Sequence, residues 1–351
     1  MRKSCLIGLL GAGLAGGWAG ATGPTLITYS SSAPVVDRWM YPFSTRPCTE
    51  LQAPIFSAPF AGFDDRDAEL LLGFRTSDSV PAGLERQRYK ILGGTVTVTV
   101  ANDLQATYNP NAESWRSALP ATDPRFVPKI QASGWPIEIF GVGYRNGFNE
   151  ATNPFQQCSA FGGAPVVPPA QGARNAFVAT FDSAGNATDL SNQLKQGVNG
   201  EPMAIGLTNS VSAGAKIPSG TTLSFDLAGI TSSNRAYLQR SLARGRVMLA
   251  VSSLEPTTGG PGGGTGGVTY PILATTRAGF AEFNPSLTLL VAITCAADFN
   301  ADGVVDTTDF VRFVASYNEL LDAEGDLNDD GQTDQDDFLL FVVAYNEFLC
   351  P

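Results

Sequence analysis

Two acidic segments near the carboxyl end of this 351-residue sequence share one spacing of oxygen-bearing residues. Each segment is twelve residues long, with Asp, Asn, Asp and Gly at positions 1, 3, 5 and 6, and Asp again at positions 9 and 12. The second segment begins 28 residues after the first. The side chains concerned are Asp298, Asn300, Asp302, Asp306 and Asp309 in the first segment, and Asp326, Asn328, Asp330, Asp334 and Asp337 in the second.

This spacing suits Ca²⁺, a hard cation that takes about six to eight oxygen ligands. Side chains at positions 1, 3 and 5 converge when the backbone curls, and glycine at position 6 permits the sharp turn. Position 7, Val304 or Gln332, would offer its backbone carbonyl, position 9 would bind through water, and position 12 would close the site. Solvated acidic turns are the alternative, but two turns in the same register argue against it. The sequence predicts two bound Ca²⁺ ions, and binding rather than catalysis.

An amphipathic helix is expected after each segment, because apolar residues recur there at i, i+3, i+4 and i+7. The two apolar stripes should pack on each other and form a small core. A module this small cannot depend on its core alone, so metal and a flanking disulfide would complete it. The stripes consist of Phe310, Phe313, Val314 and Tyr317, and of Phe338, Phe341, Val342 and Tyr345.

The negative charge of the chain is concentrated in this C-terminal part. Residues 295–351 contain 14 Asp and Glu against one arginine, a net charge of −13, whereas the whole chain carries −11, which leaves +2 for the rest. Acidity this dense requires cations and would repel the phosphates of nucleic acid. We therefore expect no nucleic-acid partner.

The repeated loop–helix unit, with Asp rather than Glu at position 12, resembles the dockerin modules of cellulosome-type assemblies. The flanking cysteines and the final Cys350-Pro351 resemble the GC-type dockerin of planctomycete exported proteins, although Leu349 stands where that type has glycine. The resemblance covers residues 295–351 and implies a cohesin-like or cell-surface partner. In dockerins, a Ser-Thr-like pair at loop positions 10 and 11 contacts the cohesin. Thr307 and Thr308 match that pair, whereas Gln335 and Asp336 do not, which favours the first helix as the contact.

The amino-terminal residues have the features of a secretory signal peptide. Met1-Arg2-Lys3 is basic, an apolar stretch of small residues follows, and Ala19-Gly20-Ala21 fits a cleavage site. The stretch is too short and too rich in glycine to anchor in a membrane, and no later stretch is long enough to span one. We expect residues 1–21 to be removed and the mature protein to be secreted or on the cell surface, without a transmembrane segment.

Four cysteines remain after this expected cleavage, an even number that suggests two disulfides in an exported chain. Three connectivities are possible for four cysteines. Because Cys295 and Cys350 bracket the C-terminal segment, we expect them to pair, and Cys48 to pair with Cys158.

Residues 22–294 have the pattern of a β protein, with short β-branched or aromatic runs between clusters of turn residues. Thr95–Val100 alternates with a period of two, which predicts valines on one face and threonines on the other. We expect a β-sandwich or jelly roll, with 234–244 as the best helix candidate. The other expected strands are Thr25–Tyr29, Leu70–Phe74, Ile137–Phe140, Ala176–Phe181, Thr222–Leu227, Val247–Val251 and Leu287–Val291.

The glycine-rich tract 257–267 has the composition of an interdomain linker. We interpret it instead as a loop within the β-sandwich domain. Strand patterns at 270–275 and 287–293 are too few for an independent fold, so they should rejoin the earlier sheets. Residues 203–293 also resemble the tail of DNRLRE-type β-sandwich domains of secreted bacterial proteins. The resembling residues are Ser224–Leu227, Tyr237–Gln239, Val247–Ser253 and Pro285–Leu289.

Chemistry in the main domain is harder to assign. The chain has no histidine, which excludes Ser-His-Asp and Cys-His nucleophilic schemes and the commonest zinc ligand sets. A glycosidase needs only two acids, and Glu138 and the cluster Asp64, Asp65, Asp67 and Glu69 are candidates. The alternatives are a solvated turn or structural calcium site for the cluster and an outward-facing strand position for Glu138. Trp39-Met40-Tyr41-Pro42-Phe43 and Trp135 would stack on sugar rings or belong to the core.

The sequence thus predicts an exported calcium-binding protein that docks through residues 295–351. Its β-sandwich, residues 22–294, would be structural or carbohydrate-binding and is more consistent with a non-catalytic role. The alternative is a dockerin-tethered glycoside hydrolase of polysaccharide catabolism.

Overall fold

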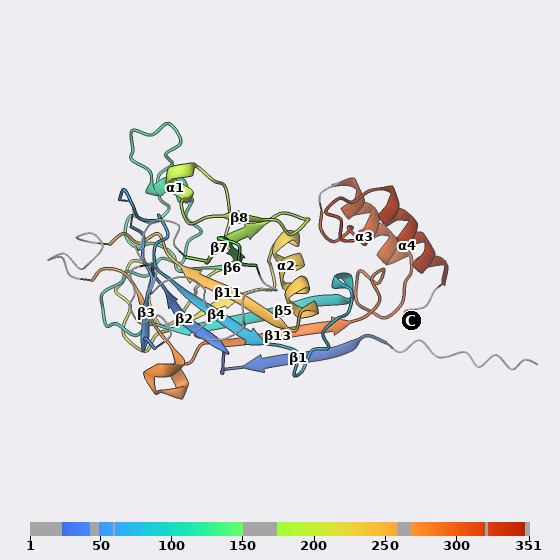
Figure 1. Ribbon diagram of the computed structural model, residues 1–351, viewed down its shortest axis with the longest axis horizontal. Helices are drawn as coiled ribbons and strands as arrows, with labels where there is room; N and C mark the ends of the chain where they lie inside the picture. Colours follow the sequence, from blue (N-terminus) through green and yellow to red (C-terminus); the bar gives the residue numbers. More distant parts are fainter. Residues whose placement is uncertain are drawn as a thin grey trace, which may run out of the picture.

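The computed structural model describes residues 23–42, 49–58, 60–149, 174–257, 268–319 and 322–347. The chain is mainly β, as the sequence predicts. Two sheets contain most of the strands, and the two C-terminal helices lie side by side at one end of these sheets (Figure 1).

The smaller of the two main sheets has four antiparallel strands. They lie in the order β1 (Thr25–Ser31), β13 (Ser286–Ile293), β5 (Tyr89–Thr99) and β10 (Thr222–Asp226). Strand β13 follows the glycine-rich tract, and its central place between β1 and β5 agrees with the expectation that this segment rejoins earlier strands.

The larger sheet is also antiparallel. Its order is β2 (Val36–Met40), β4 (Glu69–Arg75), β11 (Arg246–Ser252), β6 (Glu138–Tyr144), β7 (Ala176–Phe181) and β8 (Ala187–Asp189), and β9 (Ala204–Ile205) also pairs with β6. A separate ribbon pairs β3 (Gln52–Pro54) with β12 (Ile272–Ala274).

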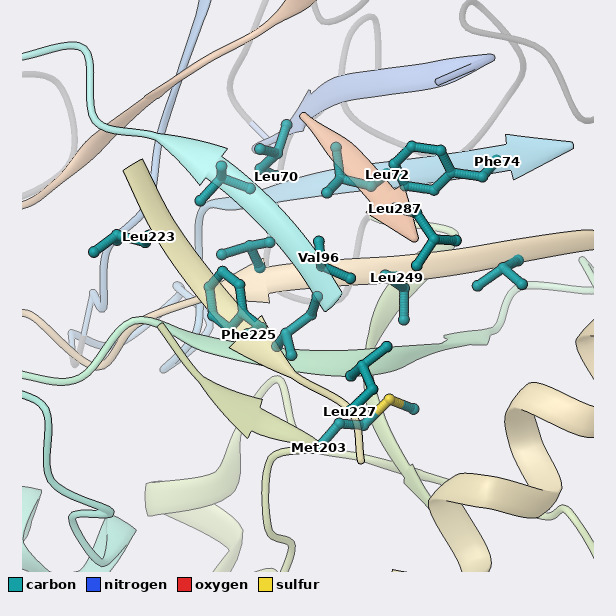
Figure 2. Close-up of a cluster of buried hydrophobic side chains, with 14 of the residues drawn as sticks. Leu70, Leu72, Phe74, Val96, Met203, Leu223, Phe225, Leu227, Leu249 and Leu287 are labelled. Carbon is teal, nitrogen blue, oxygen red and sulfur yellow. The ribbon is translucent and has the colours of Figure 1, made fainter. Parts of the chain in front are cut away.

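The main core lies between the two sheets. Val96 and Leu287 from the four-stranded sheet meet Leu72, Phe74 and Leu249 from the larger one (Figure 2). Valines 96, 98 and 100 are fully buried, so the alternation read from the sequence is confirmed. The opposite face of the larger sheet buries a second cluster that includes Leu71, Phe140 and Val178, which explains the continuous apolar run in β4.

Helix α2 (Ser232–Ala243) covers part of this domain, and Thr231 caps its first turn by accepting a hydrogen bond from the backbone N–H of Asn234. Helices α3 (Thr307–Asn318) and α4 (Gln335–Glu347) form the C-terminal pair. The shorter helices are α1 (Gln193–Gln196), η1 (Arg86–Arg88), η2 (Trp115–Ala118), η3 (Thr276–Ala278) and η4 (Ala281–Phe283).

All eight strands expected from the sequence are present, and the helix expected at 234–244 corresponds to α2. Strands β2, β3, β8 and β9 were not predicted. They are short, and Asp37 and Arg38 interrupt the apolar alternation of β2 although both are buried.

Neighbouring leucines on β13 test the two faces of the four-stranded sheet. Leu289 is fully buried in the main core, whereas Leu290 is 39% exposed. We expect Leu289→Ala to lower the free energy of unfolding by about 2–5 kcal/mol, because it removes core contacts and leaves a cavity. Leu290→Ala should lower it by less than about 1 kcal/mol, since exposed positions tolerate change. Urea denaturation measures both, and equal losses would contradict the core assignment.

Candidate functional site

The two acidic segments fold into loops with the same backbone conformation. The residue at position 4, Ala301 or Asp329, has a φ of 61° in both loops, and the glycine at position 6, Gly303 or Gly331, has a φ of 91° in both. A positive φ is uncommon for residues other than glycine, so its repetition at position 4 is informative. The 28-residue repeat in the sequence is therefore a repeat in structure.

The carboxylate at position 1 shapes each loop through hydrogen bonds to the backbone. Asp298 accepts hydrogen bonds from the backbone N–H groups of Asp302 (3.2 Å) and Gly303 (2.9 Å). Asp326 accepts the equivalent bonds from Asp330 (3.1 Å) and Gly331 (3.0 Å). The curl of the loop is thus built around this carboxylate.

The carboxylate at position 12 joins the start of each loop to the helix that follows it. Asp309 accepts hydrogen bonds from the N–H groups of Phe299 (2.7 Å) and Asn300 (3.1 Å) with one oxygen, and from Asp306 (2.9 Å) with the other. Asp337 makes the same three bonds, which it accepts from Leu327, Asn328 and Asp334 at 2.7, 3.1 and 2.8 Å.

The residues at positions 9 and 12 also begin the helices. Asp306 caps α3 by accepting from the N–H of Thr308, and with Asp309 it forms a capping box. Asp334 accepts from the N–H of Asp336 at the start of α4. The same acidic side chains therefore shape the loops and start both helices.

Helices α3 and α4 pack around one aromatic contact, which joins residues at equivalent positions of the repeat. Phe313 and Phe341 are fully buried and stack with ring centroids 4.5 Å apart. They belong to a small core with Cys295, Ala297 and Val305. The expectation that the apolar stripes pack on each other is confirmed for this pair.

The loops bury negative charge. Asp298, Asp309, Asp326 and Asp337 are all 0% exposed. Burial raises the pKa of Asp309, and the nearby Asp298 raises it further, although three backbone N–H groups act against the rise. Burial also raises the pKa of Asp326, to which Asp329 and Asp337 contribute. Among the described lysines and arginines, only Arg86 forms an ion pair with any of these four carboxylates, at Asp326.

The donors fit a hard cation by their chemistry, because each loop offers carboxylate, amide and carbonyl oxygens and nothing softer. Within the described residues, however, no three Asp, Glu, Cys or His side chains converge into a group that could hold a metal ion. The ligand sets that would serve Ca²⁺ are the positions expected from the sequence. They are Asp298, Asn300, Asp302, Val304, Asp306 and Asp309, and Asp326, Asn328, Asp330, Gln332, Asp334 and Asp337.

The residues expected to contact a partner lie on the surface. Thr307 and Thr308 form the first turn of α3 and are exposed. Beside them, apolar side chains at repeat-equivalent positions are also exposed: Phe310 and Phe338 at 39% and 38%, and Val311 and Leu339 at 61% and 52%. The helix pair therefore exposes apolar surface at these positions. Phe310 and Phe338 were expected to be inside, and they are only partly so, since they also contact Phe341 and Phe313 of the opposite helix.

Cys295 is disulfide-bonded. Cys48, Cys158 and Cys350 lie outside the described residues, so the expected pairings stay predictions.

The acidic cluster of the main domain is not a solvated turn, and that interpretation was wrong. Asp64, Asp65, Asp67 and Glu69 are at most 1% exposed. Arg174 forms ion pairs with Asp64 (2.8 Å) and with Glu69 (2.6 Å). Burial alone would raise the pKa of Asp64, but Arg174, together with Arg145 and Asn192, lowers it. The sequence could not reveal these partners, because Arg174 lies 110 residues beyond Asp64.

Glu138 is likewise buried, at 4% exposure, rather than facing outward from its strand. Its carboxylate forms an ion pair with Arg66 at 2.8 Å. Arg66 also lies over the ring of Phe140, so Glu138 belongs to the interior of the larger sheet. Among the acids considered for a glycosidase, Asp64, Glu69 and Glu138 are thus paired with buried arginines, and Asp65 is paired with Lys195.

The aromatic residues considered for stacking on sugar rings pack mainly within the protein. Trp39 and Tyr41 stack on each other in a cluster with Phe56 and Tyr270, and the indole N–H of Trp39 donates to the carbonyl of Pro54. Trp135 packs against a cluster that contains Trp115. Phe43 lies outside the described residues.

A scan against protein-family models and a search of curated proteins found no match to this chain. In the part of the chain that the structure describes, no helix is both long enough and apolar enough to cross a bilayer.

Asp67 predicts a distinct dependence of stability on pH. Burial raises its pKa to about 6, so the folded protein binds this proton more tightly than the unfolded chain does. The stabilising effect should be complete below about pH 4 and should disappear as the pH rises through about 6. This change in the protonation of Asp67 should lower the free energy of unfolding by up to about 3 kcal/mol over that pH range, and Asp67→Asn should abolish the effect. Urea denaturation between pH 4 and pH 7 measures it, and parallel curves for both proteins would contradict it.

Proposed function

We propose that this chain is an exported protein that binds two Ca²⁺ ions and docks to a cohesin-like or cell-surface partner. Residues 295–351 would form the dockerin-like module that does both. The β-sandwich before it would be structural or carbohydrate-binding.

The observation that carries the proposal is the equivalence of the two loops. They share the same positive-φ residues and the same hydrogen bonds at positions 1 and 12, and each leads into a helix of the same packed pair. Such equivalence in segments 28 residues apart is expected of a duplicated metal-binding unit. Acidic turns that merely face solvent would leave their carboxylates exposed, whereas each of these loops buries two.

Bound Ca²⁺ would supply the positive charge that these carboxylates need. Asp298 and Asp309 are buried together without an ion-pair partner among the described residues, and Asp337 is in the same position. Like charges buried together are costly unless a cation compensates them. The protein's own contribution is to hold the oxygens of each loop in place through backbone hydrogen bonds.

The docking part of the proposal is supported by the outer face of the helix pair. Val311 and Leu339 are more than half exposed, and Thr307 and Thr308 lie beside Val311 on the first helix. Exposed apolar side chains at equivalent positions of both helices would offer a partner an apolar surface.

Export is supported by the disulfide at Cys295, since disulfides persist in oxidising compartments. No observation favours the hydrolase alternative, because the acids that it would use are buried, and Asp64, Glu69 and Glu138 are paired with arginines.

Calcium binding is tested by titration calorimetry on the full chain. The wild type should bind two Ca²⁺ ions, and Asp309→Asn and Asp337→Asn should each weaken one site at least tenfold, because each substitution removes a charged ligand. Glu319→Gln is the matched control: it removes one negative charge from an exposed residue outside both loops and should bind like the wild type. Absence of Ca²⁺ uptake by the wild type would refute the proposal.

Docking is tested with a panel of recombinant cohesin modules as probes. A module that binds the full chain in Ca²⁺ should lose at least tenfold in affinity in EGTA and with Val311→Asp, which places a charge in the apolar face. Asn318→Asp adds the same charge at an exposed polar position near the end of α3 and should have little effect. Surface plasmon resonance measures the affinities, and binding that ignores both EGTA and Val311→Asp would contradict this docking face.

A further inference from the structure

The second loop faces the β domain, defined here as residues 23–294, and is held there by an arginine. Arg86, in η1, is 4% exposed. Its guanidinium donates to the backbone carbonyls of Ala323 (2.9 Å) and Asp326 (2.7 Å) and forms ion pairs with Asp326 (3.4 Å) and Asp329 (2.8 Å).

Other donors of the β domain bind the same loop. Gln87 donates to the carbonyl of Asp326 at 2.9 Å, and Arg240 of α2 donates to the carboxylate of Asp329 at 2.6 Å. Arg235 forms an ion pair with Glu324, just before the loop. The β domain therefore presents three arginines to the acidic module.

The turn between β7 and β8 also contacts the second loop, at Gly331. Ser183, in the turn between β7 and β8, donates its hydroxyl to the carbonyl of Gly331 at 2.9 Å. A Cβ atom at Gly331 would collide with Ala184, so this glycine is required for the close approach as well as for its positive φ. Loop 1 has a weaker counterpart, where Gly303 meets Pro24 without a hydrogen bond between them among the described residues.

We propose that the β domain is itself a partner of the second loop, and that Ca²⁺ in this loop locks the C-terminal module onto the β domain. This inference depends on the proposed calcium binding. It assigns different tasks to two loops of nearly the same sequence. Ca²⁺ in the second loop would hold the module against the β domain, whereas Ca²⁺ in the first loop would have no effect on this contact.

The reason lies in which atoms the β domain recognises. Arg86, Gln87 and Ser183 bind backbone carbonyls of residues 323–331, and these carbonyls are aligned only while the loop is curled. The curl places Asp326 and Asp337 together in the interior, and of these two buried carboxylates only Asp326 forms an ion pair with Arg86. Without a cation for Asp337, charge repulsion opposes the curl and the carbonyls lose their alignment.

At the first loop the β domain contacts two side chains. Thr294 donates its hydroxyl to the carboxylate of Asp298 at 2.6 Å, and the ammonium group of Lys90 lies 5.0 Å from the ring centroid of Phe299. Arg88 donates to the carbonyl of Thr294 and Lys90 to that of Ala296, at 3.1 Å each. Thr294 and Ala296 precede the first loop, so the bonds to their two carbonyls should stay in place when that loop opens.

Amide hydrogen exchange of the full chain tests the proposal. The reporters are two β-domain segments that meet the second loop, residues 85–89 and 182–186. In saturating Ca²⁺ their exchange should be slow. EGTA and Asp337→Asn should both accelerate it at least tenfold, whereas Asp309→Asn, the matched change in the first loop, should not.

Arg86→Gln separates direct contact from loop opening. With Ca²⁺ saturating, this variant should still bind two ions by calorimetry, yet residues 182–186 should exchange at least fivefold faster. Arg88→Gln, which alters an arginine that donates to Thr294 instead, should leave residues 182–186 unchanged.

The outcomes distinguish the two proposals. If the wild type binds no Ca²⁺, the proposed function fails. If Asp337→Asn loses one Ca²⁺ ion but keeps wild-type exchange at both reporters, calcium binding stands and the lock is overturned. Equal acceleration by Asp309→Asn and Asp337→Asn would also overturn it, because the lock would then not belong to the second loop.

Discussion

An ionised carboxylate can be buried only where a cation or hydrogen-bond donors replace the water that it loses, and this constraint governs both acidic regions of the protein. In the β domain, arginines supply the compensating charge: Arg174 forms ion pairs with Asp64 and Glu69, and Arg66 forms one with Glu138. In the C-terminal loops, backbone N–H groups meet it in part, and Arg86 reaches one carboxylate of four. The remaining demand for positive charge is the physical basis for proposing calcium there.

The same constraint explains how the two parts of the chain are joined. The module brings a charge of −13, and the β domain faces it with Arg86, Arg235 and Arg240. Clefts of about 300 and 690 Å³, both lined by Arg86, flank this contact. The interface is therefore a set of polar contacts rather than a continuation of a core, and interfaces of this kind are able to open.

Prediction from sequence succeeded where the signal is local. The strands of the β domain follow from β-branched runs with a period of two, as in Thr95–Val100, and the helix pair follows from aromatic residues at helical spacing. It failed for the acids 64–69 and for Glu138, because a charged residue in isolation favours solvent. Their partners lie far along the chain, as Arg174 does from Asp64. Strand β2 was missed for the same reason: its buried Asp37 is held by Arg277, 240 residues away.

The sequence by itself determined the composition of each acidic loop, since the oxygen-bearing side chains, the turn glycine and the helix that follows are encoded in one continuous segment. Tertiary structure alone decided that the two loops differ. Gly303 and Gly331 occupy the same position of the repeat, but one meets Pro24 and the other meets Ala184 beneath Ser183. The loops are unequal because, among the described residues, η1 and α2 of the β domain bind the second loop through Arg86 and Arg240.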